Sequence, residues 1–113
     1  MEIPLETRLG EGSMDEQAVR IAADSHIQAV AAGDLDHAVG YILGEDEGEA
    51  RTNLARVAEV VTSAEIEAIS IEGDEAIVQF RVETREPGRP VVRLETIWLE
   101  HAGRPMLYAG YAI

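Results

Sequence analysis

The chain has 113 residues, enough for one domain with a single core and too few for two. Its 22 acidic and nine basic residues give a net charge of −13, which repels phosphate backbones and anionic lipid, so we expect no nucleic-acid and no membrane partner. The absence of cysteine excludes disulfides, thiolate nucleophiles and thiolate metal sites.

Residues 1–12 lack a regular apolar period and contain proline and glycine, which predicts a flexible arm before a single domain over residues 13–113. This stretch has no basic segment followed by an apolar run, so it does not resemble a signal peptide. No apolar run approaches the length of a membrane span. We therefore expect a soluble, cytoplasmic protein.

Three helices are predicted in the first half of the chain. Ser13 and Glu16 form a capping-box pattern that predicts a helix over residues 14–32, ended by Gly33. Asp34 is expected to cap a second, short helix over residues 35–43. After an acidic loop, a third helix is expected over residues 50–61. The positions expected to face inward from the first helix are Val19, Ala22, Ala23, His26, Ile27 and Val30.

The apolar period changes from helical to alternating after residue 63, which predicts strands. The four expected strands are 65–72, 76–85, 91–100 and 106–113. Each has a single apolar face, so a layer of helices on one side of an antiparallel sheet follows. The fold class is therefore α+β, with three N-terminal helices packed on a four-stranded antiparallel sheet.

The order of these elements resembles the nuclear transport factor 2-like (NTF2-like) superfamily, also called SnoaL-like or cystatin-like. Three short phrases carry the resemblance: AVAAGDLDHAV at 29–39, GDEAIVQFRV at 73–82 and ETIWLEHAGR at 95–104. Two features depart from the pattern. Pro105 stands where a tryptophan usually follows Gly-Arg, and residues 44–61 replace the short strands and Asp-rich loop of many members.

The resemblance implies a cone in which a curved sheet wraps the first helix and leaves one end open. It also implies dimers formed through the outer face of the sheet. Family members include cofactor-free isomerases, dehydratases, cyclases and epoxide hydrolases as well as many proteins without catalytic activity. The fold therefore does not fix the function.

Two residues resemble catalytic groups of the ketosteroid-isomerase branch of this superfamily. His26, seven residues before Gly33, resembles a tyrosine that hydrogen-bonds the developing oxyanion. The alternative for His26 is a buried histidine satisfied by a backbone carbonyl or a carboxylate. Glu95, by its spacing from Gly103, resembles an inward-facing acid kept protonated by apolar surroundings.

The orientation of Glu95 depends on the register of the hairpin around Pro87-Gly88. A two-residue turn places Phe80 opposite Glu95 and directs Arg93 and Glu95 inward. An odd loop pairs Phe80 with Leu94 and directs Arg93 and Glu95 outward. Pro-Gly fits tight hairpins badly and the odd loop buries more apolar side chains, whereas the resemblance favours the inward placement. Both registers remain open.

Three sets of candidate site residues follow. The predicted catalytic residues are His26 and Glu95. The predicted ligand-binding residues are His26, Tyr41, Phe80, Trp98 and Tyr111. The predicted dimer interface consists of Ile77, Gln79, Arg81, Arg93, Ile97 and Leu99. The acidic loop at 45–49 lacks the order of a calcium loop, and no cofactor or metal is expected.

The leading functional hypothesis is a small homodimeric domain whose apolar cavity binds a small molecule, or which serves as an interaction module, without catalysis. The alternative is a cofactor-free isomerase, dehydratase or cyclase acting on a small apolar carbonyl compound. In that alternative His26 and Glu95 polarise the oxygen, and Glu45, Asp46 or Glu49 moves the proton.

Overall fold

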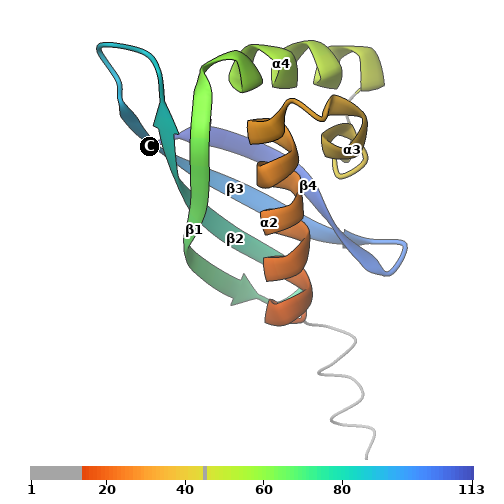
Figure 1. Ribbon diagram of the computed structural model, residues 1–113. Coiled ribbons are helices and arrows are strands. Elements are labelled where there is room, and N and C mark those ends of the chain that lie inside the picture. The colour runs from red at the N-terminus through yellow and green to blue at the C-terminus, as the bar shows by residue number, and fades with distance from the viewer. Residues whose placement is uncertain (1–13, 45) are drawn as a thin grey trace, which may run out of the picture.

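A computed structural model describes residues 14–44 and 46–113 (Figure 1). The helices are α2 (Glu16–Ala32), α3 (Leu35–Val39) and α4 (Glu47–Val60), and the strands are β1 (Val61–Glu72), β2 (Glu75–Thr84), β3 (Val91–His101) and β4 (Arg104–Ala112). The predicted α+β class, with three helices on a curved four-stranded antiparallel sheet, is confirmed. The predicted arm at 1–12 and its neighbour Ser13 lie outside the described residues.

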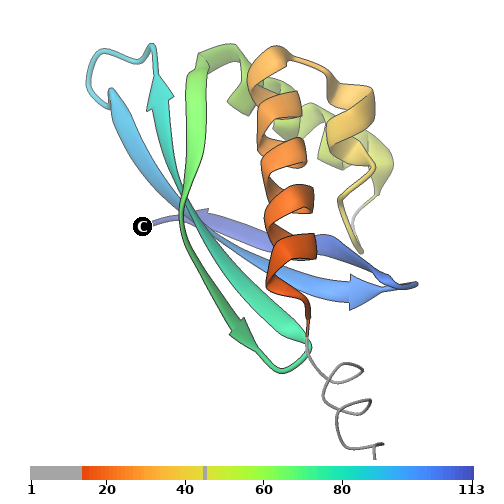
Figure 2. The ribbon, with the colours of Figure 1, turned by 60° about the horizontal axis from the view of Figure 1, so that its bottom comes forward.

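The sheet is an antiparallel meander in the order β1-β2-β3-β4. Figure 2 shows it bending and twisting around α2, which lies along its concave side. Three register shifts occur in the edge strands, at Thr62 and Glu67 in β1 and at Tyr108 in β4, where one extra residue is inserted. Such bulges bend a strand and increase its twist, so they help the sheet to curve around the helix.

The start of α2 differs from the predicted capping box. Asp15 is the N-cap, and its side chain accepts a hydrogen bond of 3.1 Å from the backbone N–H of Ala18. The preceding Met14 is buried, and its backbone N–H donates to the carbonyl of Gly73 in the β1–β2 turn. The helix therefore begins two residues later than predicted, because Met14 serves to dock the helix against the sheet.

The end of α2 and the helix after it follow local signals only in part. Gly33 ends α2 with φ 78°, the left-handed conformation in which glycine is favoured, and Asp34 caps α3 as predicted. However, α3 has only five residues instead of nine. Tyr41 and Leu43 leave the helix and exchange backbone hydrogen bonds with Leu107 of β4. This pairing across the sheet edge overrides the helical apolar period.

The third helix starts and ends earlier than predicted, at Glu47 and Val60. The carboxylate of Asp46 accepts from the N–H of Gly48 at its N-terminus. Val61 was predicted to be helical, but it is only 2% exposed and begins β1, four residues before the predicted strand start. The chain thus passes from α4 directly into the sheet.

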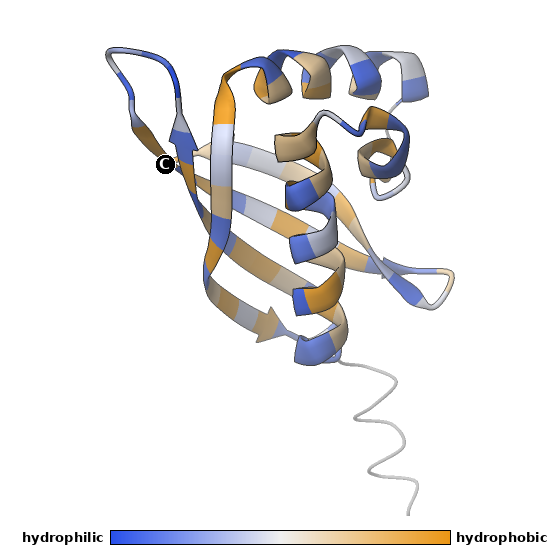
Figure 3. Cartoon of the chain, in the orientation of Figure 1, coloured by the Kyte–Doolittle hydropathy of each residue, from blue (hydrophilic) through white to orange (hydrophobic). Residues whose placement is uncertain are grey.

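The core lies between α2 and the inner face of the sheet. Apolar and polar residues alternate along the strands (Figure 3), and the inner positions are the buried ones. The largest fully buried side chains are Trp98, Phe80, Val19, Val30 and Val78. Within the described residues, no helix combines the length and apolar character that a membrane crossing requires.

The register between β2 and β3 decides which open alternative holds. Phe80 pairs with Leu94, and Gln79 pairs with Glu95, as an odd hairpin loop requires. Thr84 stabilises that loop, because its hydroxyl donates to the carbonyl of Arg89 and its backbone N–H donates to the carbonyl of Pro90. The outward placement of Arg93 and Glu95 is therefore confirmed, and the inward placement is wrong.

Candidate functional site

An apolar pocket of about 240 Å³ lies between α2, α4 and the inner face of β2, β3 and β4. Its wall is almost entirely hydrocarbon, and His26 and Thr96 supply its polar side chains. The lining residues are His26, Ile27, Val30, Leu54, Val57, Phe80, Leu94, Thr96, Leu107, Gly110 and Tyr111. A second apolar pocket, of about 210 Å³, shares Val57 and Leu94 with the first and extends toward the β2–β3 loop.

His26 comes from the middle of α2 and is only 4% exposed. Its Nδ1 lies 3.0 Å from the carbonyl oxygen of Ala38 in α3. Because a carbonyl can only accept, Nδ1–H is the donor and the proton of the neutral ring is on Nδ1. His26 therefore does what the alternative hypothesis expected, satisfying a backbone carbonyl, and it still contributes to the pocket wall.

Burial lowers the pKa of His26 from 6.5 to about 4. The hydrogen bond to Ala38 opposes this shift, and the nearby His37 adds to it. At neutral pH the ring is uncharged, so Nε2 carries a lone pair and no proton. No described residue forms a hydrogen bond to Nε2.

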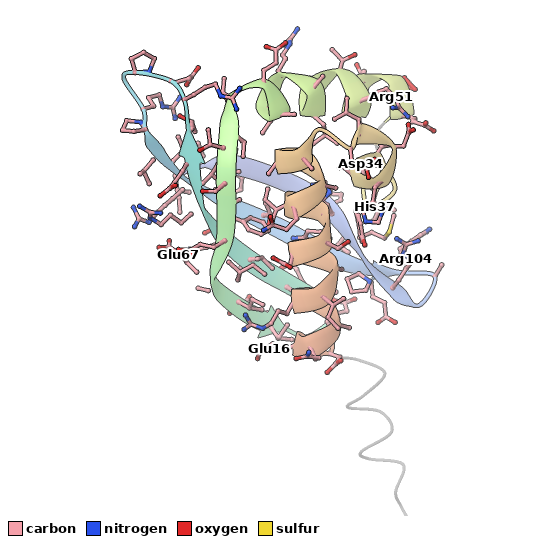
Figure 4. All side chains as sticks on the ribbon, in the orientation of Figure 1. Glu16, Asp34, His37, Arg51, Glu67 and Arg104 are labelled. Atoms are coloured by element: carbon pink, nitrogen blue, oxygen red, sulfur yellow. The ribbon has the colours of Figure 1, made fainter. Side chains whose placement is uncertain are left out.

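An aromatic cluster holds the His26 ring in place. Tyr41 and Trp98 contact it edge to face, with ring centroids 5.7 Å and 5.8 Å away. The Tyr41 ring also contacts the ring of His37, and the guanidinium carbon of Arg104 lies over the Tyr41 ring, 5.4 Å from the ring centroid. Figure 4 shows His37 and Arg104 on the same side of the molecule. The position of His26 is thus fixed by packing from α3 and the sheet.

Thr96 is the second polar side chain at the pocket, and its hydroxyl hydrogen is already donated within the chain. Its hydroxyl donates to the carbonyl of Val78 at 2.8 Å and accepts from the indole N–H of Trp98 at 2.9 Å. The group is 6% exposed and completes the hydrogen bonding of Trp98. Toward the pocket, Thr96 offers only a remaining lone pair.

Glu95 lies on the opposite face of the sheet from His26, which corrects the predicted inward placement. Its carboxylate accepts hydrogen bonds from the hydroxyl of Tyr111 and from Gln79. These bonds, the one from Tyr111 first, hold the pKa of Glu95 below its ordinary value. The structure therefore does not bring Glu95 to the same ligand as His26, and Glu95 is ionised where the resemblance implied a protonated acid.

Two of the three predicted proton-moving carboxylates, Asp46 and Glu49, do not line the pocket. Asp46 caps α4, and Glu49 is an exposed residue in the first turn of that helix. Glu45 lies outside the described residues. In residues 14–44 and 46–113, no group of three or more histidine and carboxylate side chains is arranged to hold a metal ion.

Three of the predicted ligand-binding residues line the pocket, namely His26, Phe80 and Tyr111. The hydroxyl of Tyr111 turns to the outer face, where it meets Glu95. Tyr41 and Trp98 stand behind His26 and support it. Sequence reasoning missed Thr96 and Gly110 as wall residues. The signal for Thr96 was the odd-loop register, which already placed it opposite the buried Val78.

The outer face of the sheet carries all six predicted interface residues. Ile77 pairs with Ile97 at its centre, and Leu99 lies further along β3. The charged side chains there are engaged within the chain: Arg81 with Glu83 at 2.9 Å, and Arg93 with Glu67 at 2.9 Å. Figure 4 shows Glu67 on β1, pointing away from α2.

Comparison with solved structures identifies the fold. A SEC-C motif containing protein from Rhodopseudomonas palustris matches with a TM-score of 0.68 and 20% identity over 97% of this chain and 87% of that one. A member of the NTF2-like family from Streptomyces avermitilis matches with a TM-score of 0.65 and 14% identity over 87% and 94%. The chain has the NTF2-like fold.

An LEH-like epoxide hydrolase from M. tuberculosis also shares the NTF2-like fold, with a TM-score of 0.59 and 14% identity over 86% of this chain and 84% of that one. No protein-family model and no curated protein matches the sequence. At these identities the likeness establishes the fold alone, because one fold hosts many functions. The function must be argued from the site.

Proposed function

We propose that this NTF2-like protein binds a small apolar molecule in the pocket between α2, α4 and the sheet, and that it acts without catalysis. The observation that carries the proposal is the pocket wall: nearly all hydrocarbon, with one buried and uncharged histidine. Ligand sites are concave and mostly apolar, with a few placed polar groups that orient the ligand.

The size of the pocket supports a compact ligand. A cavity of roughly 150 Å³ lined by aliphatic and aromatic side chains holds benzene. The pocket here measures about 240 Å³, so it suits a molecule of two fused rings. Leu54 and Val57 of α4 form one wall, and this helix is less buried than α2, with Ala50 as its fully buried residue.

Naphthalene is a suitable first probe, and the indole N–H resonance of Trp98 is a convenient readout because Trp98 is the single tryptophan of the chain. We expect this resonance to shift on titration, since Trp98 contacts His26 directly. Leu54→Glu should weaken binding by at least about tenfold, because it places a carboxylate in the apolar wall. Ile21→Glu, on the exposed side of α2, is the matched control and should bind as the wild type does. Failure of naphthalene to bind the wild type contradicts the proposal.

The carbonyl isomerase, dehydratase or cyclase alternative receives no support from this geometry. It requires His26 and an acid to donate hydrogen bonds to one oxygen. Glu95 is on the outer face, and the only ring proton of His26 is held by Ala38. The activity named for the epoxide hydrolase belongs to that protein and rests on its own residues.

We further propose that two copies associate through the outer face of the sheet, around Ile77, Ile97 and Leu99. The apolar side chains give this face a hydrophobic centre, and Arg81 and Arg93 are already paired with glutamates of the same chain, which lowers the desolvation cost of contact. Sedimentation at micromolar concentration tests this. The wild type should be a dimer and Ile97→Glu a monomer, with Ile21→Glu as the control that stays dimeric. A monomeric wild type contradicts the proposal.

A further inference from the structure

The two polar side chains at the pocket wall are both hydrogen-bond acceptors. The ring proton of His26 is committed to Ala38, so Nε2 has a lone pair and no described partner. The hydroxyl hydrogen of Thr96 is committed to Val78, so its oxygen also has only a lone pair to offer. Tyr111, the remaining wall residue with a hydroxyl, donates to Glu95 on the other face.

We infer that the pocket selects apolar ligands that carry a hydrogen-bond donor, such as an alcohol, a phenol or an aromatic N–H, and discriminates against carbonyl compounds and carboxylates. The donor would meet Nε2 of His26. This inference rests on the proposed ligand-binding function and specifies the chemistry of that same site. It is the reverse of an oxyanion site, which must present donors.

The preference for ligands with a hydrogen-bond donor follows from the free-energy cost of placing two acceptors against each other. A buried acceptor facing a ligand hydroxyl gains a hydrogen bond, whereas the same acceptor facing a carbonyl oxygen meets a second lone pair and remains unpaired. A carboxylate is disfavoured further, because it would enter an apolar pocket of a protein with a net charge of −13. Reversing the preference would require Nε2 to carry a proton, and the bond from Nδ1–H to Ala38 opposes that tautomer.

Three probes of one shape test the inference: 2-naphthol, 2-methoxynaphthalene and naphthalene. At neutral pH the wild type should bind 2-naphthol about tenfold more tightly than the other two, as one added neutral hydrogen bond predicts. In His26→Phe, which keeps a ring and removes the acceptor, the three affinities should become similar. His37→Gln replaces an exposed histidine and should keep the wild-type preference.

A second measurement needs no variant. The ¹⁵N shifts of the His26 ring in the ligand-free wild type should show a protonated Nδ1 and an unprotonated Nε2, and 2-naphthol should shift the Nε2 resonance. A protonated Nε2, or equal affinities for 2-naphthol and 2-methoxynaphthalene, overturns the inference while the apolar pocket remains a ligand site. If none of the three probes binds, the proposed function itself fails.

Discussion

His26 shows how the position of a single residue can be predicted from sequence while its protonation cannot. The helical period put it on the buried face of α2, and its exposure of 4% confirms this. Its protonation depends on Ala38, twelve residues away, and on the desolvation supplied by the folded core. Neither is encoded in local spacing, so the sequence offered both an oxyanion donor and a buried histidine satisfied by a backbone carbonyl, and the structure shows the second.

The lowered pKa of His26 predicts a specific pH dependence of stability. The unfolded chain takes up the proton near pH 6.5 and the folded chain near 4, so the contribution of His26 to the free energy of unfolding decreases as the pH falls through this window and is constant below it. Between about pH 7.5 and pH 5, wild type should lose roughly 2 kcal/mol more than His26→Phe. Urea unfolding at both pH values measures the difference, and His37→Gln should lose nearly as much as wild type, because His37 is the smallest of the causes that shift the pKa of His26. Parallel losses in wild type and His26→Phe would show that His26 titrates normally.

The hydrogen bonds of the Thr96 hydroxyl lead to a second prediction, which concerns the free energy of unfolding. Thr96→Val keeps the side-chain shape but leaves the buried indole N–H of Trp98 without its acceptor and removes the side-chain donor to the carbonyl of Val78. We expect a loss of about 1–3 kcal/mol in the free energy of unfolding. Thr96→Ser restores the hydroxyl and should recover most of the loss. A loss in Thr96→Ser with none in Thr96→Val would instead assign the contribution of Thr96 to packing of its methyl group.

At the scale of elements, local signals located all seven helices and strands of the described residues, and long-range contacts moved their ends. Asp34 and Gly33 mark boundaries that hold because their capping bonds are local. The second helix is shorter than predicted because residues 41–43 pair with β4, and the first strand is longer because Val61 is buried. The β2–β3 register had two open solutions, and burial of apolar side chains selects the one that the turn dipeptide also favours.

The cap of α2 can be tested directly. Asp15→Ala removes the acceptor for the N–H of Ala18 and should lower the free energy of unfolding by about 1 kcal/mol. Asp15→Asn keeps an acceptor oxygen and should lose much less. Thermal or urea unfolding of the three proteins measures this. An unchanged Asp15→Ala would mean that the docking of Met14 on the β1–β2 turn, and not the cap, fixes the start of the helix.

At the scale of the whole molecule, the two faces of the sheet differ in what they contact. The inner face surrounds α2 and contributes the pocket wall through β2, β3 and β4. The outer face presents the Ile77 and Ile97 pair together with Arg81 and Arg93, which pair with glutamates of the same chain. Sequence alternation predicted both faces, but the division of Glu95 and His26 between them required the register. The remaining surface carries a large excess of acidic groups.

That excess predicts the salt dependence of the proposed dimer. Two copies with a net charge of −13 each repel one another at long range, while Arg81 and Arg93 at the outer face are already paired with glutamates of their own protomer. Raising sodium chloride from about 20 mM to about 500 mM screens the repulsion and should strengthen self-association several-fold. Sedimentation at both salt concentrations measures it. If ion pairs across the interface held the dimer instead, added salt would weaken association, and Arg93→Gln would weaken it as well.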